Sequence, residues 1–329
     1  MKRYLLSLLI LNLGFALCGQ QIRGVVLDQS TGLPIDYASV FFGGTFVGTT
    51  TDEKGHFELD VSKYQSRPLS VSAMGYHPAS ITDFSTGEIH QVLLEAKVYD
   101  IEEVRVSTRS LVRKRKACLR IFKNEFIGLT TNSRKCYIMN EEDITFNYGS
   151  DRDTLRAYAS KPLRIQNLSL GYEISYHLDR FEYARKTQTT LYTGDIIFER
   201  DLTSDEESSR KFKWRRANAF TGSSMHFFRS LWADSLNASG FVLTNYRTGT
   251  KVDYDQIVSQ DFQGRKSLVY NQSLQIAYID KLSFISFLAF QVYFQQDGYF
   301  EPTAIIWTGE MSKQRVADSL PYEYVPESF

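Results

Sequence analysis

Short apolar runs separated by turn residues fill the first third of the chain. Each run is rich in β-branched and aromatic residues. The intervening segments contain glycine, proline and aspartate, which favour turns. Asp52 to Gly55 is typical of a hairpin turn, because Gly55 tolerates a positive φ and Asp52 can accept bonds from the backbone that follows. This pattern predicts a small β-sandwich. Its clearest strands are residues 25–27, 39–42, 57–61 and 69–73.

Helical and strand periodicities both occur in the rest of the chain. Apolar residues at helical spacing predict an amphipathic helix over 111–126, and a second helix follows the candidate N-cap Ser223 and ends before Gly240. Between them, the even-numbered positions of 168–178 are apolar, which predicts one long strand with a single buried face. Weaker alternation predicts further strands at 155–159, 274–278 and 288–294. The chain is therefore expected to be mostly β, with a larger, mainly antiparallel domain that carries two helices.

The first third also resembles a known family. Residues 24–28, 32–40, 48–57 and 69–76 resemble the carboxypeptidase regulatory-like domain, which is common in Bacteroidetes envelope proteins. The resemblance implies a seven-stranded, transthyretin-like β-sandwich over residues 22–98 that has no active site of its own. Segments such as 222–231 are similar to the uncharacterised β-rich region that follows this domain in many Bacteroidetes proteins, a likeness that implies a shared fold and no activity.

The N-terminus is typical of an exported protein. Lys2 and Arg3 precede an almost uncharged apolar run that ends at Leu17, and this run is too short for a transmembrane helix. We expect a signal peptide over 1–19, the sandwich over 22–98, a linker over 99–110 and the β-rich domain over 111–329. Cys18 raises the alternative of a lipid anchor, although Leu17 before it departs from the usual small residue. The expected location is the periplasm, the outer membrane or the cell surface, with peripheral attachment to the outer membrane as one form.

Charge and motifs exclude several classes of function. The chain has 38 basic and 38 acidic residues, so its charge gives no reason to expect nucleic-acid binding. Its five histidines do not stand at zinc-ligand spacings, and no nucleophile elbow, P-loop or dinucleotide fingerprint is present. We therefore expect no catalytic residue, no metal ligand and no cofactor, and in particular no metallocarboxypeptidase. His177 and His226 are expected to be surface or capping residues, and Asp205 to Glu207 a solvated loop.

Two cysteines and two hydroxyl residues are candidates for covalent chemistry. Cys118 and Cys136 remain after signal-peptide removal, and in an oxidising compartment they would form a disulfide; the alternative is a pair of buried free thiols. Thr154 and Ser319 lie in Asp-Ser/Thr-apolar triplets that resemble the O-glycosylation pattern of exported Bacteroidetes proteins.

Three classes of function remain open. The leading one is a non-catalytic binding or assembly accessory of an outer-membrane or cell-surface complex, whose partner is an envelope protein or a glycan. The second is a periplasmic carrier that encloses an apolar ligand in a curved sheet beneath a lid formed by residues 225–236. The third is a hydrolase with carboxylates that lie far apart in the sequence. A closed apolar cavity would favour the carrier, and a cleft with two facing carboxylates the hydrolase.

We expect the mature chain to begin near Gly19 or Gln20, because a basic start followed by an apolar run is the pattern that signal peptidases process. N-terminal sequencing of the protein from an envelope fraction checks this expectation. An intact Met1 on protein recovered from the cytoplasm would contradict it.

Overall fold

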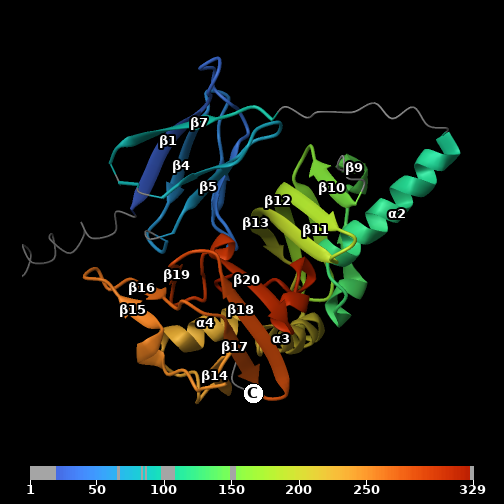
Figure 1. The fold of residues 1–329 in the computed structure, drawn as a ribbon. Helices are drawn as coiled ribbons and strands as arrows, with labels where there is room; N and C mark the ends of the chain where they lie inside the picture. Colours follow the sequence, from blue (N-terminus) through green and yellow to red (C-terminus); the bar gives the residue numbers. More distant parts are fainter. Residues whose placement is uncertain are drawn as a thin grey trace, which may run out of the picture. The chain divides into compact units, whose positions relative to one another are not determined.

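The computed structural model describes residues 20–64, 67–82, 84–85, 87–97, 108–148 and 153–326. Backbone contacts divide the chain into two units, one with residues 1–43 and 47–101 and the other with residues 44–46 and 102–329. Figure 1 shows the elements of both units. The predicted signal peptide with Cys18, and residues 99–107 of the predicted linker, lie outside the described residues.

The first unit is a sandwich of two sheets around an apolar core. One sheet has the strand order β4–β1–β7 and the other β3–β2–β5–β6. Val26, from the first sheet, and Val40 and Phe42, from the second, are fully buried in one core. The predicted seven-stranded β-sandwich is thus confirmed. Its strands are β1 (Gln21–Asp28), β2 (Ser39–Phe42), β3 (Gly48–Thr50), β4 (His56–Asp60), β5 (Leu69–Ser72), β6 (Ala79–Ile81) and β7 (Ile89–Leu94).

The turn before β4 has the predicted chemistry. One carboxylate oxygen of Asp52 accepts hydrogen bonds from the backbone N–H groups of Lys54 and His56, at 2.9 and 2.8 Å. Gly55 has a φ of 75°, and a Cβ atom at this position would lie 2.6 Å from the carbonyl oxygen of Val26. Glycine is therefore required by both the turn and the close approach of β1.

A six-stranded antiparallel sheet forms the first half of the second unit. Its strand order is β8–β11–β12–β10–β9, and β13 pairs with β12 along the other edge of that strand. The long strand β12 is therefore the centre of the sheet. Helix α2 (Thr108–Phe126) covers it. The strands are β8 (Cys136–Ile138), β9 (Ile144–Tyr148), β10 (Thr154–Ala159), β11 (Leu163–Asn167), β12 (Tyr172–Ala184) and β13 (Thr189–Asp201).

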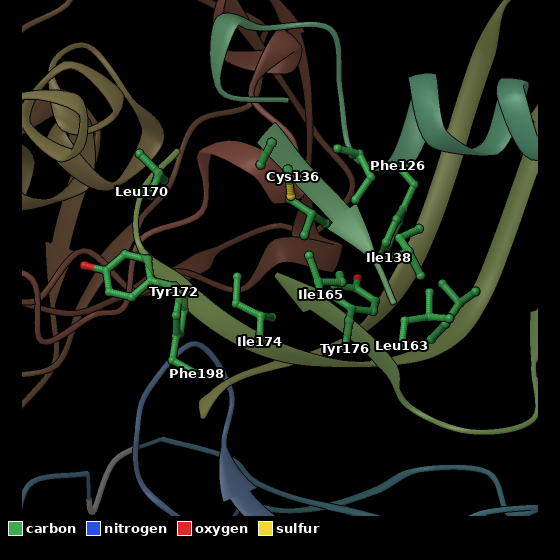
Figure 2. Packing of buried hydrophobic residues seen from close by; sticks show 14 of the residues in the cluster. Phe126, Cys136, Ile138, Leu163, Ile165, Leu170, Tyr172, Ile174, Tyr176 and Phe198 are labelled. Atoms are coloured by element: carbon green, nitrogen blue, oxygen red, sulfur yellow. The ribbon is translucent and has the colours of Figure 1, made fainter. Parts of the chain in front are cut away.

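Aromatic contacts hold α2 against this sheet. The ring centroids of Phe122 and Phe181 are 4.7 Å apart, and those of Phe126 and Tyr176 are 4.8 Å apart, both in edge-to-face arrangement. Figure 2 shows Ile174 and Tyr176 on the side of β12 where the rest of this core gathers. None of the described helices, α2 included, is long and apolar enough to cross a membrane.

The second half of the unit has two smaller antiparallel sheets around helix α4 (Ser224–Trp232). Phe227, Phe228 and Leu231 of α4 are fully buried in the core shared with these sheets. The first sheet has the order β14–β17–β18–β20 and the second β15–β16–β19. Their strands are β14 (Phe241–Asn245), β15 (Val258–Gln260), β16 (Lys266–Leu268), β17 (Leu274–Tyr278), β18 (Lys281–Phe287), β19 (Val292–Phe294) and β20 (Ile305–Gly309).

Short 3₁₀ segments and one further helix complete the second unit. The helix is α3 (Glu206–Phe220), which directly precedes α4. The 3₁₀ segments are η2 (Thr131–Lys135), η3 (Glu141–Asp143), η4 (Tyr254–Gln256), η5 (Pro302–Ala304), η6 (Met311–Lys313) and η7 (Val316–Asp318). The structure thus confirms a mostly β fold with antiparallel sheets, but its described part has three helices where the second domain was predicted to have two.

Two predicted strands begin later in the sequence than expected. Residues 168–171 form the turn between β11 and β12, because the side-chain oxygen of Asn167 accepts bonds from the N–H groups of Ser169 and Leu170 and Gly171 has a φ of 74°. Among 288–294, only Val292–Phe294 is a strand, and Leu288 and Phe290 are exposed. In both places the apolar alternation begins several residues before the first residue of the observed strand.

Helix α3 was missed because its buried face is not apolar in sequence. Its buried residues are Arg216, Ala219 and Phe220, so only one large apolar side chain marks the inner face. Asp205, predicted to lie in a solvated loop, is instead the N-cap, and its carboxylate accepts a 2.7 Å bond from the N–H of Ser208. The acidic residues that follow are the first turn of the helix, where negative charge is favourable.

The neighbouring residues Ile174 and Ser175 of β12 should respond oppositely to a charge. Ile174 is 2% exposed within the core, whereas the partly exposed Ser175 pairs with the exposed Arg164 of β11. We expect Ile174→Asp to lower the free energy of unfolding by about 3 kcal/mol or more, because it buries an unpaired carboxylate. Ser175→Asp should change it by under about 0.5 kcal/mol. Urea denaturation of both variants measures the difference, and equal losses would contradict the assignment of the two faces.

Candidate functional site

A hollow of about 580 Å³ lies beside helix α3 in the second unit. Its walls are η2 with the residue before it, the last two turns of α3 with the turn to α4, the first residue of β18, and η6 and η7. We call this hollow the α3 groove and define it by the lining residues within 130–135, 214–222 and 310–318, together with Ser169 and Lys281. Its size is that of a site for a small ligand.

Buried Arg216 holds α3 in place. Its guanidinium donates to the carbonyl oxygens of Leu170, at 2.7 Å, and Gly171, at 3.1 Å, in the turn before β12. It also forms a bidentate pair with Asp201 at the end of β13, at 2.8 and 2.9 Å, and lies 4.0 Å above the ring of Tyr172. Burial alone would raise the pKa of Asp201, but the bonds from Arg216 and Thr203 outweigh it and hold that pKa below the usual range.

The turn before β12 is shaped to receive the helix. Gly171 has a positive φ, and a Cβ atom there would lie 2.5 Å from the ring of Phe212 in α3. The close packing of helix on turn therefore depends on glycine at this position. Next to Arg216 in sequence, Arg215 faces the groove and donates one bond, at 3.2 Å, to the carbonyl oxygen of Ser169.

Asp318 links η7 to Thr130 and η2 in the opposite wall of the groove. Its carboxylate accepts bonds from the hydroxyl of Thr130, at 2.9 and 3.0 Å, and from the side-chain amide of Asn132, at 2.8 Å. Burial raises the pKa of Asp318, because the folded chain removes its carboxyl group from water. Gln314 extends this wall to the helix by donating a 2.9 Å bond to the carbonyl oxygen of Ala219. The lining of the groove is thus connected by hydrogen bonds on both sides of α3.

The groove is rich in cationic side chains. Five basic and two acidic residues line it, and of the basic ones Lys313 pairs with Glu310. The other four have no ion-pair partner within the described part of the chain; we call Arg134, Lys135, Arg215 and Lys281 the four groove cations. The side chain of Trp214 lies at the same hollow and is 62% exposed. A cationic hollow with an exposed indole favours a ligand that combines negative charge with a flat apolar surface.

The two carboxyl groups of the groove are both engaged. Glu310 pairs with Lys313, and Asp318 accepts from Thr130 and Asn132. Across the described residues, no group of three or more histidine, cysteine, aspartate or glutamate side chains is placed to share a metal ion.

The residues singled out in the sequence lie elsewhere. Cys118 and Cys136 are both buried free thiols, so the disulfide alternative is not formed in the structure. The Cys118 thiol donates to the Tyr148 hydroxyl at 3.6 Å, and burial raises the pKa of Cys136 to about 12. The two thiols are therefore buried separately and are not joined by a disulfide bond.

The two glycosylation candidates are partly buried. Thr154 is the first residue of β10 and pairs with Ala184 of β12. Ser319 follows η7, and both of its neighbours, Asp318 and Leu320, are buried. The structure therefore places each triplet within packed chain and not on an exposed loop.

Of the two histidines considered in the sequence, His177 differs from its predicted position and His226 does not. His177 was expected on the polar face of the long strand, but it is 8% exposed. It lies just before the irregularity at Leu178 and Arg180, where β12 changes register against β13. His226 is in the first turn of α4, as expected, and its Nδ1 accepts a 3.1 Å bond from the N–H of Gly222. Burial, with Arg229 nearby, lowers the pKa of His226.

Sequence reasoning missed the groove. Its signal was the basic run of 210–216, which contains Trp214 and was not recognised as part of a helix. The remaining lining residues come from segments as far apart as Thr130 and Asp318, so no local pattern brings them together.

Arg216 and Arg215 form a matched pair for testing the anchor of α3. Arg216→Ala should lower the free energy of unfolding by about 3 kcal/mol, because it removes the donor to the Leu170 carbonyl group, one of the donors to the Gly171 carbonyl group and the bidentate pair with Asp201. Arg215→Ala should cost under about 1 kcal/mol, because it removes a single bond from a partly exposed side chain. Urea titration measures both, and similar losses would show that Arg216 does not anchor the helix.

Comparison with known proteins identifies the first unit. Residues 22–106 match the family model described as CarboxypepD_reg-like domain. A crystal structure from Bacteroides fragilis NCTC 9343, of a protein described as membrane-associated and of unknown function, matches with a TM-score of 0.18 and 10% identity, over 88% of this chain and 94% of that chain. No curated protein matches the chain. The chain therefore begins its described part with a carboxypeptidase regulatory-like β-sandwich.

Proposed function

We propose that the protein is a non-catalytic, exported binding component of the cell envelope, and that the α3 groove binds an anionic ligand. The main support is that four cations line this one hollow. None of them has an ion-pair partner among the described residues. These cations come from η2, α3 and β18, so only the folded unit brings them together. Convergent positive charge raises the local concentration of anions and speeds their association.

The other two functions have less support. The carrier requires residues 225–236 to act as a lid, but Phe227, Phe228 and Leu231 of α4 are fully buried in a core with two sheets. A lid helix would have to give up this burial each time it opened. The hydrolase requires carboxyl groups that are available to a substrate, and in the α3 groove both are engaged by neighbouring side chains.

Reversal of charge in η2 tests the proposal. We expect the protein to be retarded in native gels that contain dextran sulfate or polygalacturonate, and we expect Arg134→Glu/Lys135→Glu to abolish the retardation, because both side chains are exposed at the groove. The control is Lys54→Glu/Lys63→Glu, which makes the same change in net charge at exposed positions of the first unit.

The control must keep the retardation if the groove is the site. Equal loss in both double variants would show that net charge, and not the groove, causes the binding. Absence of retardation of the unchanged protein in every polyanion gel would reject the proposed function itself. Thermal denaturation of each variant excludes unfolding as the cause of a loss.

A further inference from the structure

A second hollow adjoins the α3 groove. It has a volume of about 570 Å³ and lies along the first half of α3, where it is lined by Leu168 and by residues of α3 from its N-cap Asp205 to Phe212. Lys135 and Arg215 line both hollows. The two hollows therefore follow each other along one helix, with these two cations at their junction.

The two hollows differ in charge. In the second hollow, Lys211 pairs with Glu207 on the next turn of the helix, and Asp205 caps the helix. Its remaining cations are the two shared ones, so its own lining is close to neutral. The α3 groove, by contrast, has three more basic residues than acidic ones. A ligand that fills both hollows would carry its negative charge at the α3 groove and at the junction.

Neutral hydrogen-bonding groups are abundant in the α3 groove. The side chains of Thr131, Asn132, Asn218 and Thr221 line it with Trp214 at the same hollow. Amides and hydroxyls can both donate to and accept from ligand hydroxyls, and an exposed indole offers a flat apolar surface for the C–H face of a sugar ring. Arginine adds paired donors that fit a carboxylate or sulfate. An acidic peptide such as poly-glutamate would use the cations, and its backbone could bond the neutral groups, but it would offer no flat C–H face to the indole.

We infer that the ligand is an acidic oligosaccharide chain that lies along α3 and fills both hollows. This inference rests on the proposed function and adds to it the ligand class and its extent. Charged sugar units bind at the α3 groove and at the junction, and the neighbouring units of the chain continue past Leu168 into the second hollow. Each hollow has the volume of a site for about two or three sugar units, since pockets of about 300 to 1,000 Å³ hold drug-sized ligands.

Calorimetric titration with oligogalacturonides of different length tests the extent of the site. We expect the affinity to rise at least about tenfold from a dimer to a hexamer, because only the longer chain reaches the second hollow. Leu168→Trp should fill that hollow, since Leu168 is 39% exposed in a turn beside it. This variant should reduce the affinity for the hexamer to that for the dimer and leave the affinity for the dimer unchanged.

Trp214→Ala tests the sugar character of the ligand. We expect it to weaken oligogalacturonide binding about fivefold, since stacking on one aromatic ring contributes about 1 kcal/mol. Binding of poly-glutamate, which has the charge but no sugar rings, should be weaker in the unchanged protein and unaffected by this substitution. Neutral xylo-oligosaccharides should bind more weakly than oligogalacturonides of the same length.

Failure of this inference can be distinguished from failure of the proposed function. Equal affinity for dimer and hexamer, or no effect of Leu168→Trp, would overturn the occupation of the second hollow. Poly-glutamate that binds as tightly as the sugars, together with no effect of Trp214→Ala, would overturn the sugar assignment. Both results would leave an anion-binding groove. Absence of retardation of the unchanged protein in every polyanion gel would instead reject the proposed function.

Discussion

The contact between Arg216 and the end of the central sheet determines where the groove lies. One guanidinium satisfies the carbonyl groups of Leu170 and Gly171 and pairs with Asp201, all at the same end of β12 and β13. Gly171 also accepts a 2.9 Å bond from the N–H of Leu202, and Asp201 accepts bonds from Thr203. An apolar side chain in place of Arg216 would therefore remove the bond to the Leu170 carbonyl group and leave the other two groups with fewer donors. The rest of α3 contributes little buried apolar surface, and its position therefore depends on this contact more than on hydrophobic packing.

The two walls of the α3 groove are held in different ways. On one side the helix is tied to the sheet by a charged group, and on the other Asp318 ties η7 to Thr130 and Asn132 through hydrogen bonds. The contacts of Asp318 join residues more than 180 positions apart in the sequence, and those of Arg216 join α3 to residues 15 to 46 positions before it. The polar network is thus structural where it is buried and is available to a ligand where it is exposed.

Local patterns in the sequence were sufficient for much of the fold. The alternation around Ile174 predicted a buried strand face, and the chemistry of Asp52 to Gly55 predicted a hairpin turn. Helix α3 was not predicted, because periodicity detects apolar faces and the inner face of α3 is marked by Arg216. The start of β12 was misplaced because Asn167 and Gly171 form a turn that interrupts a continuous alternation. The groove could not be predicted, since its lining depends on tertiary contacts alone.

In the proposed function, helix α3 separates stability from recognition at adjacent positions. Arg216 faces inward and is buried, whereas Arg215 and Trp214 next to it line the groove and are partly or largely exposed. Exposed helix positions accept many side chains at little energetic cost. In a binding protein of the proposed kind, ligand preference could therefore diverge by single substitutions on this surface, while Arg216, which orients the helix, is constrained by the sheet beneath it.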